Sequence, residues 1–258
     1  LISHILNDIY NLNLSDLDLV LLSQKAEREF ILVNCGIMDQ FAIGMSEKNK
    51  AILLDTNTLD YSLVDFYLDN ATLIIVNTNK PRALVESKYN ERRAECDKAL
   101  AILSKKYHKD TLCSYDLSEL ESVKDELGDT LYHRCRHVIS ENKRVFAFKE
   151  SLEARNLKNL GELLKQSHKS LKEDYEVTGI NLDTICAELD KEGIVIGSRM
   201  TGAGFGGCSV AIFDTTDLDK IDKVMNKVNK VYSEVTNLNL SYYVVKSSGR
   251  TGILNEDN

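Results

Sequence analysis

Gly202-Ala203-Gly204-Phe205-Gly206-Gly207, followed directly by Cys208-Ser209-Val210-Ala211-Ile212-Phe213, is the stretch that decides the fold class of this 258-residue chain. The glycines match the Gly-x-Gly-x-x-Gly spacing of a dinucleotide-binding fingerprint. That fingerprint needs a helix after the glycines, with its N-terminus under the pyrophosphate. The β-branched and aromatic residues after Cys208 instead predict a strand, so the sequence argues against a Rossmann fold here.

The same loop holds more glycine than one turn requires. A β-turn alone is the structural interpretation, but four of its six residues are glycine. Residues without a Cβ let backbone amides approach a bound group closely, which favours contact with a ligand. The loop therefore supplies four candidate cofactor-binding residues, namely Gly202, Gly204, Gly206 and Gly207.

Periodicity on either side of this loop predicts a mixture of helices and strands. Ser15 and Asp18 form a helix N-cap signal, and the short apolar runs Phe41–Met45 and Ala51–Leu54 are typical of a β-hairpin. Pro81, the only proline, predicts a loop before a helix that carries Tyr89 near its start. The remaining expected strands are Thr72–Val76, one from Ile194, Cys208–Phe213 and Ser241–Val245; the remaining helices are Leu131–Glu153, Leu157–Leu171, Leu182–Leu189 and Leu218–Val235. This order predicts an α+β fold.

Composition limits the class of partner. The chain is 43% hydrophobic, enough for a sizeable core, and its formal net charge is −8. A net acidic protein is a poor match for nucleic acid or an anionic membrane, and no apolar run approaches the ~20 residues of a membrane span. We expect a soluble, cytoplasmic protein with small-molecule partners, no nucleic acid and no membrane.

Cysteine and histidine usage gives no metal site. The six cysteines are scattered without a Cys-x-x-Cys pair and predict reduced core thiols. His133 and His137 stand four residues apart, as two zinc ligands on one helical face would. Arg134 and Arg136 between them would repel a cation, so an exposed helical face is the favoured interpretation.

A second motif places a carboxylate in an apolar turn. In Asn34-Cys35-Gly36-Ile37-Met38-Asp39-Gln40, Asp39 follows a predicted helix and a glycine. By itself the aspartate could cap a helix or bind loop amides. Together with Ser87-Lys88-Tyr89-Asn90-Glu91-Arg92-Arg93 and Arg199–Cys208, however, it makes nearly the whole chain resemble the galactokinases of the GHMP small-molecule kinase superfamily.

The resemblance implies roles for individual residues. Asp39 matches the family's catalytic carboxylate beside the anomeric hydroxyl, Gly36 a backbone contact to the sugar, and Tyr89 a second sugar contact, 50 residues after Asp39 (89 − 39 = 50). The glycine-rich loop matches the third family motif, beside the phosphates. Arg92 and Arg93 could contact phosphate, although surface ion pairing is the commoner role of such arginines.

The resemblance also implies the reaction and the limits of the chain. It implies transfer of phosphate from ATP, with Mg²⁺, to the anomeric hydroxyl of galactose, giving galactose 1-phosphate. The family's phosphate loop, magnesium ligands and N-terminal sugar contacts would precede Leu1, so the chain is expected to be an inactive fragment of a protein that is a monomer at full length. Residues 1–66 would end the N-terminal domain and 67–258 would form the C-terminal domain, an antiparallel sheet covered by helices. An N-acetylgalactosamine kinase and a non-catalytic galactose and ATP sensor remain alternatives.

Overall fold

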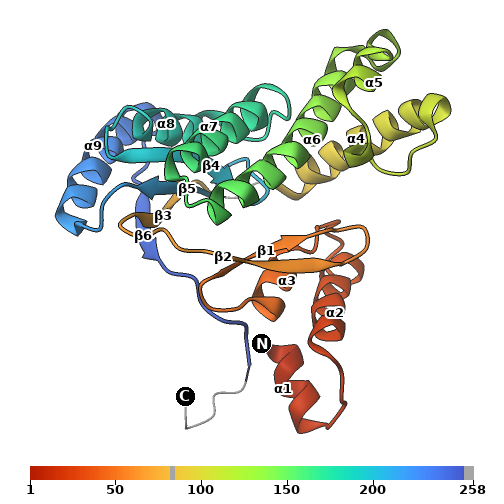
Figure 1. Ribbon diagram of the computed structural model, residues 1–258, viewed down its shortest axis with the longest axis horizontal. Helices are drawn as coiled ribbons and strands as arrows, with labels where there is room; N and C mark the ends of the chain where they lie inside the picture. The colour runs from red at the N-terminus through yellow and green to blue at the C-terminus, as the bar shows by residue number, and fades with distance from the viewer. Residues whose placement is uncertain (82–84, 253–258) are drawn as a thin grey trace. The chain divides into compact units, whose positions relative to one another are not determined.

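The computed structural model describes residues 1–81 and 85–252, which form two compact units (Figure 1). The first unit is Leu1–Tyr67 together with the residues from Lys246 on, and the second is Leu68–Val245. The C-terminal residues join the first unit because Thr251 N donates to the Ile43 carbonyl at 2.9 Å. These units differ at that end from the expected domains, 1–66 and 67–258, which stay a prediction.

The first unit contains α1 (Ile2–Ile9), α2 (Asp16–Glu29), α3 (Met38–Met45), β1 (Lys50–Leu54) and β2 (Tyr61–Asp65). The predicted start of α2 is confirmed as a capping box. Asp18 N donates to Ser15 Oγ at 3.2 Å, and Ser15 N donates to Asp18 Oδ2 at 3.0 Å. Each bond satisfies a backbone donor that the first helical turn leaves without a partner.

The predicted hairpin of Phe41–Met45 with Ala51–Leu54 is wrong in its first strand. Phe41–Met45 belongs to α3, where Phe41 is buried with Val20 of α2. At Gly44 a Cβ would lie 2.3 Å from Val20 Cγ2, so glycine lets the two helices pack closely. A short apolar run fits a buried helix as well as a strand. The partner of β1 is instead β2, with Lys50 opposite Asp65.

The second unit is built on an antiparallel sheet of order β4-β5-β3-β6. Its strands are β3 (Thr72–Asn77), β4 (Val195–Thr201), β5 (Cys208–Phe213) and β6 (Ser241–Val245). The strands expected from sequence are confirmed, and the strand after the glycines rules out the dinucleotide fingerprint. In register, Thr72 lies opposite Phe213 on β5 and Asn77 lies opposite Ser241 on β6.

Helices α7 (Leu157–Glu173), α8 (Gly179–Leu189) and α9 (Leu218–Thr236) lie along one side of this sheet (Figure 1). Ile221, Val228 and Tyr232 of α9 join the buried core with the strands, whereas Val235 near the end of the helix is exposed. This core carries apolar side chains from both layers, which is the usual origin of stability in an α+β unit.

A second core lies among the remaining helices of this unit. These are α4 (Val85–Tyr107), the 3₁₀ turn η1 (Leu112–Ser114), α5 (Leu117–Glu121) and α6 (Lys124–Glu153). Leu103 of α4 and Ile139 of α6 are buried in it, as is Cys135. Helix α6 begins seven residues before the expected Leu131 and kinks at Gly128, where φ is +67°.

The loop predicted after Pro81 falls on residues 82–84, outside the described residues. In the described part of the chain, no helix combines the length and the apolar character needed to cross a membrane.

Candidate functional site

Asp39 and Gly36 lie together in the first unit, at the start of α3. Asp39 is in the first turn of the helix, and both residues are exposed. The Asp39 carboxylate has no hydrogen bond or ion pair to any residue that the structure describes. An aspartate that served to cap a helix would accept backbone N–H bonds, and the N-cap position of α3 is Ile37. The carboxylate is therefore free to contact a ligand.

The turn before Asp39 packs on α2 and is hydrogen-bonded to it. Ile37 is buried against Val20, and Gln24 Nε2 donates to the Cys35 carbonyl at 3.4 Å. Gln40 Nε2 donates to Glu27 Oε1 at 2.8 Å, while its buried Oε1 finds no donor among the described residues. These contacts fix the backbone of the motif, and the Asp39 side chain stays exposed to solvent.

Tyr89 and the glycine-rich loop lie in the second unit. Tyr89 is half-buried in the first turns of α4, as expected from sequence. Burial raises the pKa of Tyr175 above its ordinary value, and the nearby Cys96 and Tyr89 raise it further. The ring of Tyr175 also stacks on His137, with centroids 4.5 Å apart. Tyr89 is thus near the half-buried Tyr175.

The glycine-rich loop has a backbone that ordinary residues rarely adopt. The φ angles of Gly202, Gly204, Gly206 and Gly207 are +77°, +82°, +127° and +78°, and Phe205 between them has φ +59°. At Gly204 a Cβ would lie 2.2 Å from the Val177 carbonyl oxygen, whereas at Gly202 nothing lies within 4 Å. Close packing against Val177 therefore accounts for Gly204, without any ligand.

The loop is tied to its surroundings at two points. Phe205 N donates to the Val177 carbonyl at 2.6 Å, and Thr78 N donates to the Gly207 carbonyl at 2.9 Å. Thr78 is held in turn because the Tyr232 hydroxyl donates to its carbonyl at 2.6 Å. The loop is thus anchored to the end of β3 and to the segment after α7.

Arg92, expected at the surface, is buried. Its Nε donates to the Tyr175 carbonyl at 2.7 Å, and its Nη1 donates to Glu95 Oε2 at 2.9 Å. Arg93 alone matches the expected surface pairing, since it is exposed and bonds Asp97 at 2.9 Å. Arg92 is buried and Arg93 is exposed because α4 packs one face on α6, and Arg92 lies on that face.

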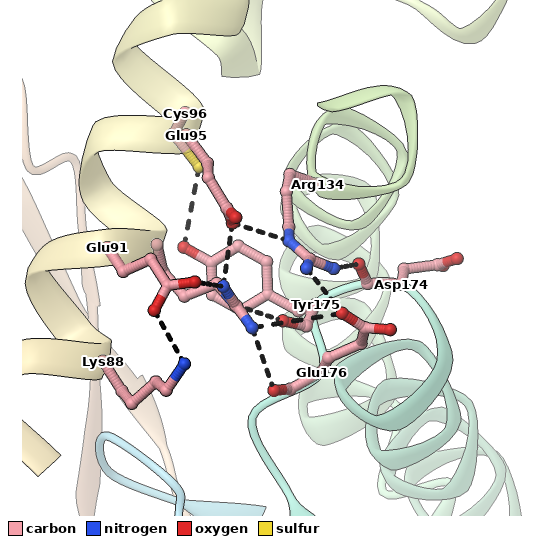
Figure 2. Close-up of polar contacts among 9 residues, drawn as sticks. Lys88, Glu91, Glu95, Cys96, Arg134, Asp174, Tyr175 and Glu176 are labelled. Carbon is pink, nitrogen blue, oxygen red and sulfur yellow. Dashed lines mark hydrogen bonds and ion pairs between the residues drawn. The ribbon is translucent and has the colours of Figure 1, made fainter. Parts of the chain in front are cut away.

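Arg134 of α6 makes a similar set of bonds, visible between Glu95 and Glu176 in Figure 2. It donates from Nε to Glu95 Oε2 at 2.8 Å, from Nη1 to the Asp174 carbonyl at 2.5 Å and from Nη2 to Glu176 Oε2 at 2.6 Å. The guanidinium holds the pKa of Glu176 below its ordinary value. Two buried arginines therefore converge on residues 174–176.

The expected exposed face around His133 and His137 is also wrong. His137 is buried, and burial lowers its pKa to about 4. Ser170 Oγ donates its only proton to Asp174 Oδ2 at 3.0 Å, so the 3.0 Å contact with His137 Nδ1 must use a proton on the histidine. Arg136 pairs with the same Asp174. The helical period was correct, but α7 and residues 174–176 cover this face.

The third motif also reaches α6. Arg199 Nη1 donates to Glu141 Oε1 at 3.1 Å, and its Nε donates to the Met200 carbonyl at 2.8 Å. Burial raises the pKa of Glu141, but Ser167 and Arg199 lower it more, so the net shift is downward. Glu141 is thereby held as an anion beside Arg199 of β4.

Two of the six thiols, Cys135 and Cys186, are buried as expected, whereas Cys35, Cys96 and Cys208 are only half-buried. Burial raises the pKa of Cys135 and of Cys186 to about 12, which makes both unreactive at neutral pH. Cys113 is an exception because it is exposed.

The described residues contain no group of three or more His, Cys, Asp or Glu side chains placed to hold a metal ion. Residues 1–81 and 85–252 thus offer no preformed cluster of this kind for the Mg²⁺ that the resemblance implies.

Sequence reasoning missed residues 174–177. They follow α7, and Arg92, Arg134 and Phe205 all bond them. Four of these bonds are accepted by backbone carbonyls, which cannot be recognised from the pattern of side chains in the sequence. Glu176 has φ +55°, and only asparagine or glycine would have signalled that conformation in the sequence.

Comparison with known protein families places this arrangement in a class. The chain matches the family description "GHMP kinases N terminal domain" over residues 2–47 and "GHMP kinases C terminal" over residues 148–234. Asp39 lies within the first match and the glycine-rich loop within the second. The chain belongs to the GHMP kinase family.

The relatives that the chain matches at high identity include galactokinases. It is 47% identical over 252 residues to the Clostridium beijerinckii galactokinase and 49% identical over 220 residues to that of Enterococcus faecalis. A crystal structure of Lactococcus lactis galactokinase complexed with galactose matches with a TM-score of 0.93 at 45% identity. A Leishmania major mevalonate kinase structure matches at 17% identity and a TM-score of 0.61, which shows the fold alone.

The matches cover almost all of this chain but only part of the relatives. The Clostridium match covers 97% of this chain and 64% of its relative, and the Enterococcus match covers 85% and 57%. The Lactococcus structure is matched over 98% of this chain and 64% of its own length. The chain thus spans less than two thirds of the relatives it matches.

Proposed function

We propose that this chain is part of an ATP-dependent kinase that phosphorylates the anomeric hydroxyl of galactose. The observation that carries the proposal is the exposed, unpartnered Asp39 carboxylate at the start of α3, in a chain 45% identical to a galactokinase whose structure holds galactose. In this proposal the third of the relatives' length that the chain does not match supplies the remaining phosphate and metal contacts.

Asp39 orients the sugar hydroxyl and accepts its proton. Phosphoryl transfer has a loose transition state, so the protein contributes mainly positioning and electrostatic stabilisation. An aspartate carboxylate is a weak base toward an alcohol, and it takes the proton late, as the new P–O bond forms. Met38, also exposed in this turn, carries no group that could replace it.

Gly36 and Tyr89 bind the sugar, and the glycine-rich loop lies beside the phosphates. Gly36 is exposed and offers backbone groups close to Asp39 in sequence. Tyr89 offers a hydroxyl that donates and accepts, on a half-buried ring. The four glycines of the loop carry no Cβ atoms beside their amides, which suits contact with anionic oxygens.

The test is a coupled ADP-release assay on a protein that carries this chain and the rest of the relatives' length. We expect galactose-dependent turnover, and we expect little from the 258 residues alone, because an unneutralised triphosphate next to Asp39 would be repelled. Asp60, exposed in the turn before β2, provides a matched control as Asp60→Asn. If Asp39→Asn and Asp60→Asn turn over galactose equally, the assigned role is wrong.

A further inference from the structure

We propose that Arg92 is a positioning residue for the glycine-rich loop, acting through residues 175–177. Neither residue type nor spacing suggested this, because Arg92 and the loop are more than a hundred residues apart in sequence. The kinetic part of the inference rests on the proposed function. The structural part does not.

Arg92 is a buried arginine whose guanidinium is fully engaged in hydrogen bonds. Its side chain is 9% exposed, and a buried guanidinium must have partners for its N–H groups. Nε bonds the Tyr175 carbonyl at 2.7 Å, Nη2 the Glu176 carbonyl at 3.4 Å and Nη1 the Glu95 carboxylate at 2.9 Å. One rigid fork therefore holds two consecutive carbonyls against α4.

These bonds support an unusual backbone conformation at Glu176. Glu176 has φ +55°, in the left-handed region that residues with a Cβ seldom occupy. Such a residue keeps its conformation only where its surroundings over-determine it. Arg92 binds its carbonyl, and Arg134 binds its carboxylate at 2.6 Å.

The segment of residues 175–177 contacts the glycine-rich loop directly. Val177, the next residue, accepts the Phe205 N–H at 2.6 Å and lies directly against Gly204. Phe205 stands in a run of residues with φ between +59° and +127°, which has no regular hydrogen-bond ladder of its own. The direction of the Val177 carbonyl therefore sets where the Phe205 amide points.

Arg93 gives a matched control on the same helix. It is an arginine next to Arg92, with an exposed side chain that bonds only Asp97 at 2.9 Å within the described residues. Arg93→Gln removes the same charge without touching residues 175–177. Arg92→Lys keeps the charge, but a single ammonium cannot reproduce the fork.

The direct experiment is amide hydrogen exchange of Phe205 in the 258-residue chain, followed by NMR, with Ile212 of β5 as the internal reference. We expect Arg92→Gln to speed exchange at Phe205 by about tenfold or more relative to Ile212, because one hydrogen bond is weakened locally. We expect Arg92→Lys to do the same to a lesser degree and Arg93→Gln to have no effect.

A Phe205 amide that is unprotected in the wild type, or that exchanges at the wild-type rate in Arg92→Gln, overturns the proposal. If Arg92→Gln does not fold, Arg92→Lys decides by the same criterion. None of these outcomes depends on kinase activity, so the result stands even if the proposed function fails.

The kinetic experiment applies to the full-length kinase. We expect Arg92→Lys to lower kcat and raise KM for ATP by about tenfold each, with KM for the sugar changed by less than threefold. A role in stability alone would lower the melting temperature and leave the kinetic constants of the folded enzyme unchanged. That result, with Arg93→Gln as the reference, would contradict the positioning role.

Discussion

Arg92 Nε donates a 2.7 Å hydrogen bond to the backbone carbonyl of Tyr175, which lies 83 residues further along the chain. Two residues beyond Tyr175, the Val177 carbonyl accepts the Phe205 N–H of the glycine-rich loop. The motif around Tyr89 and the motif around Gly204 are therefore linked through one short segment. Their positions are coupled by backbone bonds rather than by direct side-chain contact.

The glycines of the loop differ in how much they tolerate a side chain. Gly204→Ala places a Cβ 2.2 Å from the Val177 oxygen at a positive φ. Gly202→Ala places its Cβ in open space, so the only cost is the backbone strain of its positive φ. We expect Gly204→Ala to lower the free energy of unfolding by about 2 kcal/mol more than Gly202→Ala. Urea unfolding of the two variants measures this difference. Equal losses would show that contact with Val177 does not restrict the loop.

Tyr89→Phe tests the proposed sugar contact. Loss of one hydrogen bond to a bound sugar should lower kcat/KM for the sugar by the equivalent of about 1–3 kcal/mol and leave KM for ATP nearly unchanged. Tyr107→Phe, at the other end of α4, removes a hydroxyl that bonds Ser122 at 2.6 Å and should change neither constant. Steady-state kinetics with each substrate varied in turn decides. An equal effect on both substrates would argue against a sugar contact at Tyr89.

His137 should make the fold sensitive to acid. Burial lowers its pKa from 6.5 to about 4, while Glu141 and Asp174 oppose this and Arg144 and Arg199 add to it. Between these values the unfolded chain binds a proton that the folded chain does not, so stability falls as the pH drops below about 6.5.

The pH effect can be isolated with a variant. From pH 7 to pH 5 we expect the His137 contribution to cost about 2 kcal/mol of unfolding free energy. His137→Gln removes the titrating group, so its unfolding free energy should fall less over that interval than the wild-type value. Urea unfolding at the two pH values measures both. If the unfolding free energies of wild type and His137→Gln fall equally from pH 7 to pH 5, His137 does not titrate as a buried neutral group.

Asp39→Asn should separate stability from activity. Asp39 is exposed and has no partner among the described residues, so its replacement should change the unfolding free energy by less than about 0.5 kcal/mol. Turnover by the full-length kinase should fall by about 10²–10⁴-fold because the group that accepts the proton is lost. A large loss of stability with turnover retained would indicate a structural aspartate.

Much of the second unit could be predicted from sequence because its signals are local. The strand after the glycines and the helix Leu218–Val235 both follow their own periodicity, and the structure places them within one residue of expectation. Phe41–Met45 was misassigned because five apolar residues fit helix and strand alike. Strand β2 was missed because its partner β1 decides its role, which a single segment does not reveal.

The candidate site was predictable where side chains carry the chemistry and unpredictable where the backbone does. Asp39 and Tyr89 could be singled out from their motifs. Surface pairing was expected for Arg92 because charged residues are commonly exposed, whereas α4 packs on α6 and the carbonyls of residues 175 and 176 accept bonds from the buried guanidinium. The reason for Gly204 likewise lies in the position of Val177, which sequence alone does not fix.

The most direct test of the proposed function identifies the product by ³¹P NMR after the full-length kinase is incubated with ATP, Mg²⁺ and either galactose or N-acetylgalactosamine. We predict galactose 1-phosphate as the new phosphomonoester from galactose, at least tenfold less product from N-acetylgalactosamine, and product formed about 10²–10⁴-fold more slowly when Asp39 is replaced by asparagine. Preferential phosphorylation of N-acetylgalactosamine, or binding of galactose and ATP without any phosphorylated sugar, would contradict the assignment.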